Sequence, residues 1–193
     1  MPYIIARKGD RIYIDANVLV YYFYSKYRPY FYQKANDFLL KVQGGKFEGV
    51  ISCITIMEFI KSLRELFVEY GKIGSMQEVE NLVQQFVRDV FSIAHLKFVG
   101  GCPADMGPTF RTEELYKAVS SKALQIMQKY PGKIGTSAEA GEPEHEGIHT
   151  ADAFHVILAK RLQCNKLATF AWEFKQTASE ITPLILIDHD TFW

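Results

Sequence analysis

Residues 11–23 read RIYIDANVLVYYF, and this stretch decides the fold. Its first apolar run, Ile12–Ile14, ends at Asp15, and a second apolar run begins at Val18. A short β-branched run that ends at a carboxylate is typical of a buried parallel strand, which places the acid at its carboxyl end. Open α/β sheets bind their ligands at that edge. We therefore expect Asp15 to lie in a functional site, together with acids that follow the neighbouring strands.

The rest of the chain alternates between strand-like and helix-like segments. We expect further strands at residues 49–54, 95–99, 166–169 and 184–187, and helices from residue 17 to the break at Pro29 and at 30–44, 55–70, 75–93, 112–129 and 150–163. This alternation favours a parallel sheet with right-handed crossovers and helices on both faces. The prediction is therefore an α/β fold, a three-layer α/β/α arrangement around a central parallel five-stranded sheet.

The predicted domain organisation is a single domain, residues 1–193, with helical and loop insertions around residues 71–147. Gly and Pro are dense in residues 100–108, and residues 131–147 contain Gly, Pro and Glu but few apolar side chains. We expect both segments to be surface loops.

The composition is that of a globular protein. Of the 193 residues, 48% are hydrophobic and 23% are charged. The 22 basic and 22 acidic residues cancel, which argues against a broad polyanion-binding surface but allows a local basic patch. The three cysteines, Cys53, Cys102 and Cys164, form no C-x-x-C pair, so we expect no zinc site. No signal peptide and no membrane-length apolar run are visible, which predicts a cytoplasmic protein.

Three acids occupy similar places in their predicted elements. Asp15 ends the first strand, Glu58 lies near the start of the helix after the second strand, and Asp152 lies near the start of the helix before the fourth. If the first and fourth strands are neighbours, all three acids converge on one edge of the sheet. Clustered carboxylates need a cation to stay ionised, and an all-oxygen site suits Mg²⁺ or Mn²⁺. Such a site supports metal-assisted hydrolysis of a phosphodiester.

Each acid also has a purely structural interpretation. Thr55 and Glu58 have the spacing of a capping box, in which Glu58 would bond back to the start of its own helix. Asp152 is placed where a helix macrodipole favours acids, and Asp15 could close a turn at the end of its strand. Any one acid alone is better explained this way. The set, at equivalent edges of one predicted sheet, favours a site.

Three ordered motifs resemble the PIN-domain ribonucleases. They are Asp15-x-Asn17-Val18-Leu19, Ile54-Thr55-x-x-Glu58-Phe59, and Thr150-Ala151-Asp152-Ala153-Phe154-His155 ahead of Leu167-Ala168-Thr169-Phe170. The largest branch of that family is the toxin half of VapC-type toxin–antitoxin pairs. The resemblance implies a sheet in strand order 3-2-1-4-5, Mg²⁺ or Mn²⁺ as cofactor, endonuclease action on RNA, and an antitoxin protein or a second copy of the chain as partner.

The resemblance also implies roles for individual residues. Asp15, Glu58 and Asp152 match acids of the family as catalytic residues and metal ligands, while Asn17 and Thr169 would orient them. The family usually has a fourth acid where this chain has Ala171, and Glu173 is the candidate replacement. Lys61 and Arg64, which follow Glu58 on the same predicted helix, are candidates for phosphate contacts; exposed helix charges are the alternative.

Alternative functions stay open. Ala171 favours a degenerate PIN domain that binds RNA or protein without cutting, and a receiver-like domain phosphorylated on Asp15 ranks last because no lysine follows the final strand. His145, His149 and His155 lie near several glutamates and are interpreted as part of a solvated acidic loop rather than as a metal cluster. The tyrosines of residues 21–27 could stack bases or dock a partner helix, but core and surface tyrosines are the favoured interpretation.

Overall fold

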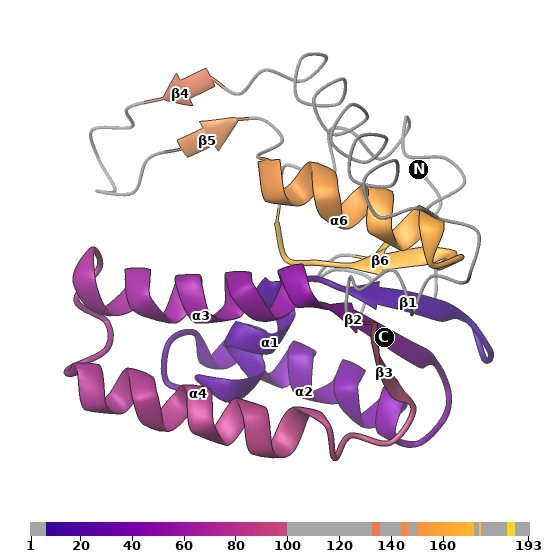
Figure 1. Cartoon of the computed structure of the whole chain (residues 1–193), viewed down its shortest axis with the longest axis horizontal. Coiled ribbons are helices and arrows are strands. Elements are labelled where there is room, and N and C mark those ends of the chain that lie inside the picture. Colours follow the sequence, from indigo (N-terminus) through magenta and orange to yellow (C-terminus); the bar gives the residue numbers. More distant parts are fainter. Residues whose placement is uncertain are drawn as a thin grey trace, which may run out of the picture.

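The computed structural model describes residues 7–99, 133–135, 144–146, 150–171, 174 and 185–187. Its centre is a parallel sheet in the order β3-β2-β1-β6-β7. The strands are β1 (Arg11–Ile14), β2 (Glu48–Ser52), β3 (Leu96–Val99), β6 (Lys166–Ala168) and β7 (Ile185–Ile187). β1 therefore lies between β2 and β6, so the ends of these three strands share one edge (Figure 1). The predicted α/β fold with a central parallel sheet is confirmed.

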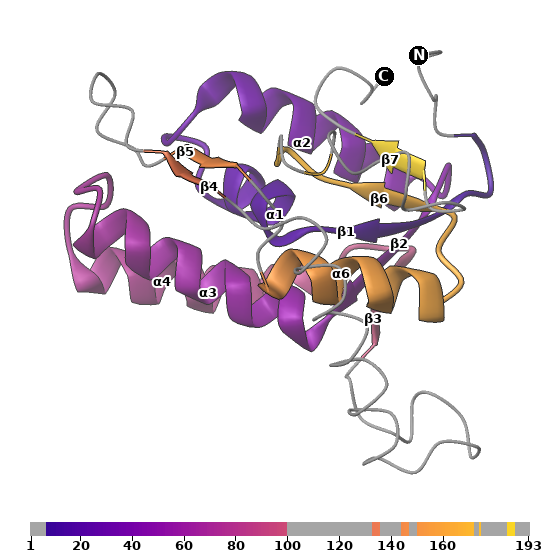
Figure 2. The ribbon, with the colours of Figure 1, turned by 90° about the horizontal axis from the view of Figure 1, so that it is seen from above.

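Helices cover both faces of this sheet. They are α1 (Ala16–Phe23), α2 (Pro29–Gln43), α3 (Cys53–Val68), α4 (Met76–Val90) and α6 (Thr150–Arg161). Figures 1 and 2 show α6 on one side of the sheet and the group of α1, α2, α3 and α4 on the other. α2 begins with Pro29, whose fixed φ suits a first helical position, and Gly44 caps its end. Among the described residues, no helix is both long and apolar enough to cross a bilayer.

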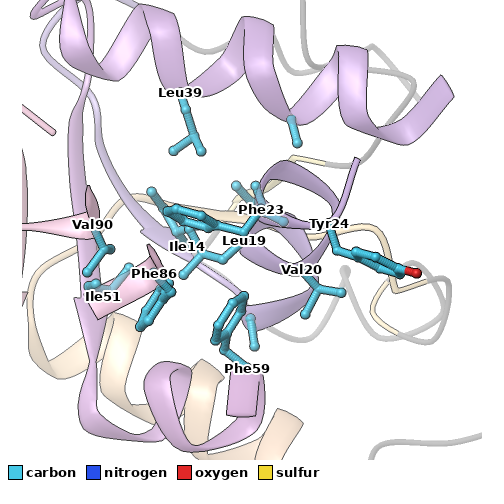
Figure 3. Close-up of a cluster of buried hydrophobic side chains, with 14 of the residues drawn as sticks. Ile14, Leu19, Val20, Phe23, Tyr24, Leu39, Ile51, Phe59, Phe86 and Val90 are labelled. Atoms are coloured by element: carbon cyan, nitrogen blue, oxygen red, sulfur yellow. The ribbon is translucent and has the colours of Figure 1, made fainter. Parts of the chain in front are cut away.

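The alternation of side chains along β1 builds two cores. Ile12 and Ile14 point into the larger cluster, which α1, α2, α3 and α4 complete (Figure 3). There the rings of Phe59 and Phe86 stack with centroids 4.1 Å apart. Tyr13 points the other way, into the smaller cluster beneath α6. Its hydroxyl is thereby carried to the α6 face of the sheet, beside the end of β1.

The described residues of the segment predicted as a loop, 131–147, form two short strands. They are β4 (Lys133–Gly135) and β5 (Glu144–Glu146), which pair antiparallel. The prediction of a loop without strands is therefore wrong. The two strands are recognised by their pairing with each other, and the hydropathy of residues 131–147 does not reveal that pairing. The predicted helix at 112–129 and the predicted loop at 100–108 lie outside the described residues.

Candidate active site

Asp15 lies at the carboxyl end of β1, as predicted, and is 4% exposed. Its backbone N–H donates to the carbonyl of Ala168 in β6 at 3.0 Å, which extends the pairing of the two strands. Its Oδ2 accepts from Asn17 Nδ2 at 2.8 Å and from Thr169 Oγ1 at 2.5 Å. Asp15 makes no side-chain cap on α1, so its carboxylate is held from two elements rather than closing a local turn.

Glu58 enters the site from α3, and the capping box proposed for it is wrong. The box lies one turn earlier: Ser52 Oγ accepts from the Thr55 amide at 3.4 Å, and the Ser52 amide donates to Thr55 Oγ1 at 3.2 Å. Ser52 is therefore the N-cap, and α3 begins at Cys53, two residues before the predicted start. With the cap satisfied by Ser52 and Thr55, the Glu58 carboxylate is available for contacts across the sheet edge.

His155 is the residue of the site whose role was missed. It is fully buried on α6, with Nε2 3.6 Å from Asp15 Oδ1 and in hydrogen-bond contact with Glu58 Oε2. Its assignment to a solvated acidic loop is therefore wrong. The signal that could have found it is the helix itself: residues 150–163 are apolar on most sides, so a histidine within that helix is a buried histidine.

A buried hydroxyl network orients the His155 ring. Tyr13 Oη lies 3.0 Å from His155 Nδ1 and 2.6 Å from Ser52 Oγ. Thr55 Oγ1 donates to the same Tyr13 oxygen at 3.3 Å. The residues that cap α3 therefore also position the imidazole, so the local structure of β2 and α3 is coupled to the geometry at the end of β1.

Burial and most neighbouring groups act in opposite directions on the pKa values of Asp15 and His155. Burial raises the pKa of Asp15; His155 and the Thr169 hydroxyl oppose this rise, Glu58 adds to it, and the net pKa is raised. Burial alone would lower the pKa of His155, but the Tyr13 oxygen, Glu58 and Asp15 raise it well above its ordinary value. A proton on both nitrogens of His155 would place a positive charge beside the two carboxylates and offset part of their repulsion.

The same three side chains could hold a metal ion. Asp15, Glu58 and His155 each offer one ligand atom, and these atoms all lie within 4.8 Å of one another. Two carboxylates and an imidazole suit a divalent cation, and the nitrogen donor moves the preference from Mg²⁺ toward Mn²⁺ or a later transition metal. Because a ligating nitrogen must be deprotonated, a proton on His155 Nε2 and a bound metal would be alternative positive charges beside the two acids.

The other predicted site residues are placed less centrally. Asp152 is half-buried on α6, three residues before His155, and the metal-capable group found among the described residues does not include it. Glu173 lies outside the described residues. The Ala171 amide donates to Thr169 Oγ1 at 2.9 Å, so this position supports Thr169 through its backbone.

The two predicted phosphate contacts are exposed side chains of α3. Lys61 is 68% exposed and pairs with Glu65 at 3.3 Å, and Arg64 is also exposed. Both are accessible to a ligand that approaches along α3 from Glu58, and their roles stay predictions.

We expect Tyr13→Phe to lower the free energy of unfolding by about 1–3 kcal/mol, because one hydroxyl serves Ser52, Thr55 and His155 in a buried network. Urea denaturation of wild type and variant, compared at equal m-values, measures this loss. Tyr30→Phe, at a position 57% exposed, is the matched control and should cost nothing measurable. Equal stability of both variants would contradict the network.

Comparison with known proteins finds a similar fold but does not assign the chain to a family. No family model and no curated protein matches the sequence. Among solved structures, the chain is similar to VapBC2 from Rickettsia felis, determined bound to a DNA fragment from its promoter, with a TM-score of 0.51. The identity is 16%, and the match covers 92% of this chain and 98% of that chain. The likeness supports the PIN-like arrangement of sheet and helices.

Proposed function

We propose that this chain is a metal-dependent endoribonuclease of the PIN type, acting as the toxin of a toxin–antitoxin pair. The observation that carries the proposal is the cluster of Asp15, Glu58 and His155 at the carboxyl edge of a parallel sheet. Two buried or half-buried acids beside a buried histidine are costly unless they serve a function or a ligand. Similarity of the fold to VapBC2 supports the same proposal.

Asp15, Glu58 and His155 would hold Mg²⁺ or Mn²⁺, with Mn²⁺ favoured by the imidazole donor. When bound, the metal would polarise the scissile phosphodiester and activate water. Asn17 and Thr169 fix the direction of the Asp15 carboxylate, and Tyr13 fixes the ring of His155. Asp152, one turn from His155 on α6, is proposed as a further acid of the site.

The proposed substrate, partners and location follow from the resemblance to the PIN-domain ribonucleases. RNA is the substrate, with Lys61 and Arg64 on α3 contacting its phosphates. An antitoxin protein and a second copy of the chain are the proposed partners, in a single-domain cytoplasmic protein.

Cleavage of a mixed RNA pool tests the activity. Wild type is expected to cut in Mn²⁺ or Mg²⁺ and not in EDTA, and Glu58→Gln is expected to lose at least about 10²-fold in rate, because it removes one charged group from the reaction centre. Glu80→Gln makes the same chemical change at an exposed position of α4 and controls for a contaminating ribonuclease. Equal cutting by all three proteins, or cutting that survives EDTA, would contradict the proposal.

A second candidate function is RNA binding without cleavage. Ala171 stands where an acid is expected, and His155 Nε2 lies against the carboxylates of both Asp15 and Glu58. Under this alternative, wild type and Glu58→Gln bind RNA with similar affinity, and neither cuts it in any metal.

A further inference from the structure

A small pocket opens between α1 and α3 next to the acid cluster. Its volume is about 170 Å³, and the apolar side chains of Val20 and Leu66 form part of its lining. Asn17 lines the same pocket while its Nδ2 donates to Asp15 at 2.8 Å. The pocket and the acid site therefore share a wall. Figure 1 shows the two helices that border it lying side by side.

The walls of the pocket are aromatic. Tyr21, Tyr27 and Tyr70 all line it, and Tyr70 is 37% exposed while the other two are half-buried. The rings of Tyr21 and Tyr27 are nearly parallel, at 13°, with centroids 5.8 Å apart. The volume is below the roughly 300–1,000 Å³ of sites for drug-sized ligands, so the pocket suits a single planar ring system. Aromatic side chains around such a space are a stacking platform for a base.

One edge of the pocket is polar. Ser62 and Glu65 line it from α3, and Ser62 lies one helical turn after Glu58, so the polar edge continues the face of α3 that carries the acid site. An ionised glutamate only accepts hydrogen bonds. Lys61, the partner of Glu65 at 3.3 Å, is exposed, so this ion pair contributes little free energy and can rearrange. Glu65 is therefore suited to receive the exocyclic amino group of a base.

We propose that this pocket is a subsite for one unpaired nucleobase next to the scissile phosphate, and that Glu65 makes it prefer a base with an exocyclic amino group over uracil. The inference rests on the proposed function, because it assigns the pocket to the substrate of that site. A base in a duplex is held in the stack between its neighbours and cannot enter a pocket of about 170 Å³, so the subsite selects single-stranded RNA.

The test separates binding from cleavage by working in EDTA. Fluorescence anisotropy with 5′-labelled oligocytidylate is expected to show wild type binding the single strand, and Tyr27→Leu binding it about 5- to 150-fold more weakly, the range for loss of one stacked base. Tyr27→Phe retains the ring and should bind like wild type. Tyr30→Leu removes an exposed ring that does not line this pocket and is the matched control, expected to have no effect.

Base preference tests the role of Glu65. Wild type should bind oligocytidylate several-fold more tightly than oligouridylate of the same length, and more tightly than the same oligocytidylate annealed to its complement. Glu65→Gln should narrow the difference between the two single strands, because an amide donates as well as accepts. Glu69→Gln, just beyond α3, is the control of equal chemistry and should leave the preference unchanged.

The outcomes distinguish this inference from the proposed function. Normal cleavage by wild type with unchanged binding by Tyr27→Leu would overturn the subsite and leave the nuclease standing. No binding of any single strand by wild type, or equal binding of cytidylate, uridylate and duplex, would also overturn it. Weaker binding by Tyr27→Leu and a narrowed preference in Glu65→Gln, in a protein that does not cut, would support the subsite and contradict the nuclease.

Discussion

Asp15→Asn is expected to reduce metal-dependent RNA cleavage by at least about 10²–10³-fold without unfolding the protein. The amide has nearly the shape of the carboxylate, and with its oxygen at the Oδ2 position it can still accept from Asn17 and Thr169. What it loses is the negative charge that faces His155 Nε2 at 3.6 Å. The loss should therefore fall on metal binding and chemistry rather than on the positions of β1 and β6.

Stability should move in the opposite direction from activity. The Asp15 carboxylate is buried beside Glu58, and its raised pKa means that the ionised form is disfavoured in the folded state. A neutral amide removes that cost, so in EDTA the Tm of Asp15→Asn should be at least that of wild type. Each 1 kcal/mol gained in the free energy of unfolding should raise the Tm by about 2–4 °C. Asp37→Asn, at an exposed position of α2, should change neither activity nor Tm.

A marked fall in Tm for Asp15→Asn would show that the carboxylate is a structural group, paired to His155 for stability. Full activity in the variant would remove Asp15 from the catalytic residues.

The position of Asp15 could be predicted because its signals are local. A buried strand is visible as the apolar run of Ile12–Ile14, and the carboxylate that ends it is the next residue. Parallel strands deliver their ends to one edge, so Asp15 and Thr169 could be expected together once β1 and β6 were taken as neighbours. The structure places them in direct hydrogen-bond contact.

The role of His155 could not be predicted in the same way, because it depends on packing between distant elements. The apolar helix around His155 signals its burial, but its position beside Asp15 and Glu58 depends on how α6 packs on Tyr13, which β1 directs to that face of the sheet. Glu58 was ambiguous for a related reason: two capping boxes overlap in sequence, and the choice of Ser52 over Thr55 as N-cap depends on where β2 ends. The position of His155 and the N-cap of α3 both depend on tertiary contacts, which a single sequence does not reveal.

Lys166→Ala is expected to lower the free energy of unfolding by about 3–5 kcal/mol, because it leaves a buried carboxylate without its cation. Lys166 and Asp10 are 4% and 7% exposed, and Lys166 Nζ lies 2.7 Å from Asp10 Oδ2. Asp10 also accepts from Asn165 Nδ2 at 2.8 Å and from the Arg7 amide. Lys97→Ala, which removes an exposed lysine paired with the half-buried Glu48, is the control and should cost less than about 1 kcal/mol.

The pH dependence of the stability lost in Lys166→Ala shows whether the ion pair with Asp10 causes it. Burial alone would raise the pKa of Asp10, but Lys166, the Arg7 amide and Asn165 together lower it below its ordinary value of 3.8. A carboxylate with a lowered pKa stabilises the folded state above its unfolded pKa, and this contribution disappears as the pH falls through the folded pKa. Without Lys166, its hydrogen bond and its charge no longer lower the pKa of Asp10. Urea midpoints should therefore differ most between wild type and Lys166→Ala at neutral pH, and converge as the pH falls below about 4.

A constant difference between the two proteins across this range would show that lost packing of the lysine stem, rather than the ion pair, causes the destabilisation. The pair ties the start of β1 to the start of β6, in the register that sets Ile12 against Lys166 and Ile14 against Ala168. That register also brings Asp15 beside Thr169 at the other end of the two strands. Activity of Lys166→Ala should therefore be lost at a lower urea concentration than in wild type, in step with unfolding, while its activity without urea is retained.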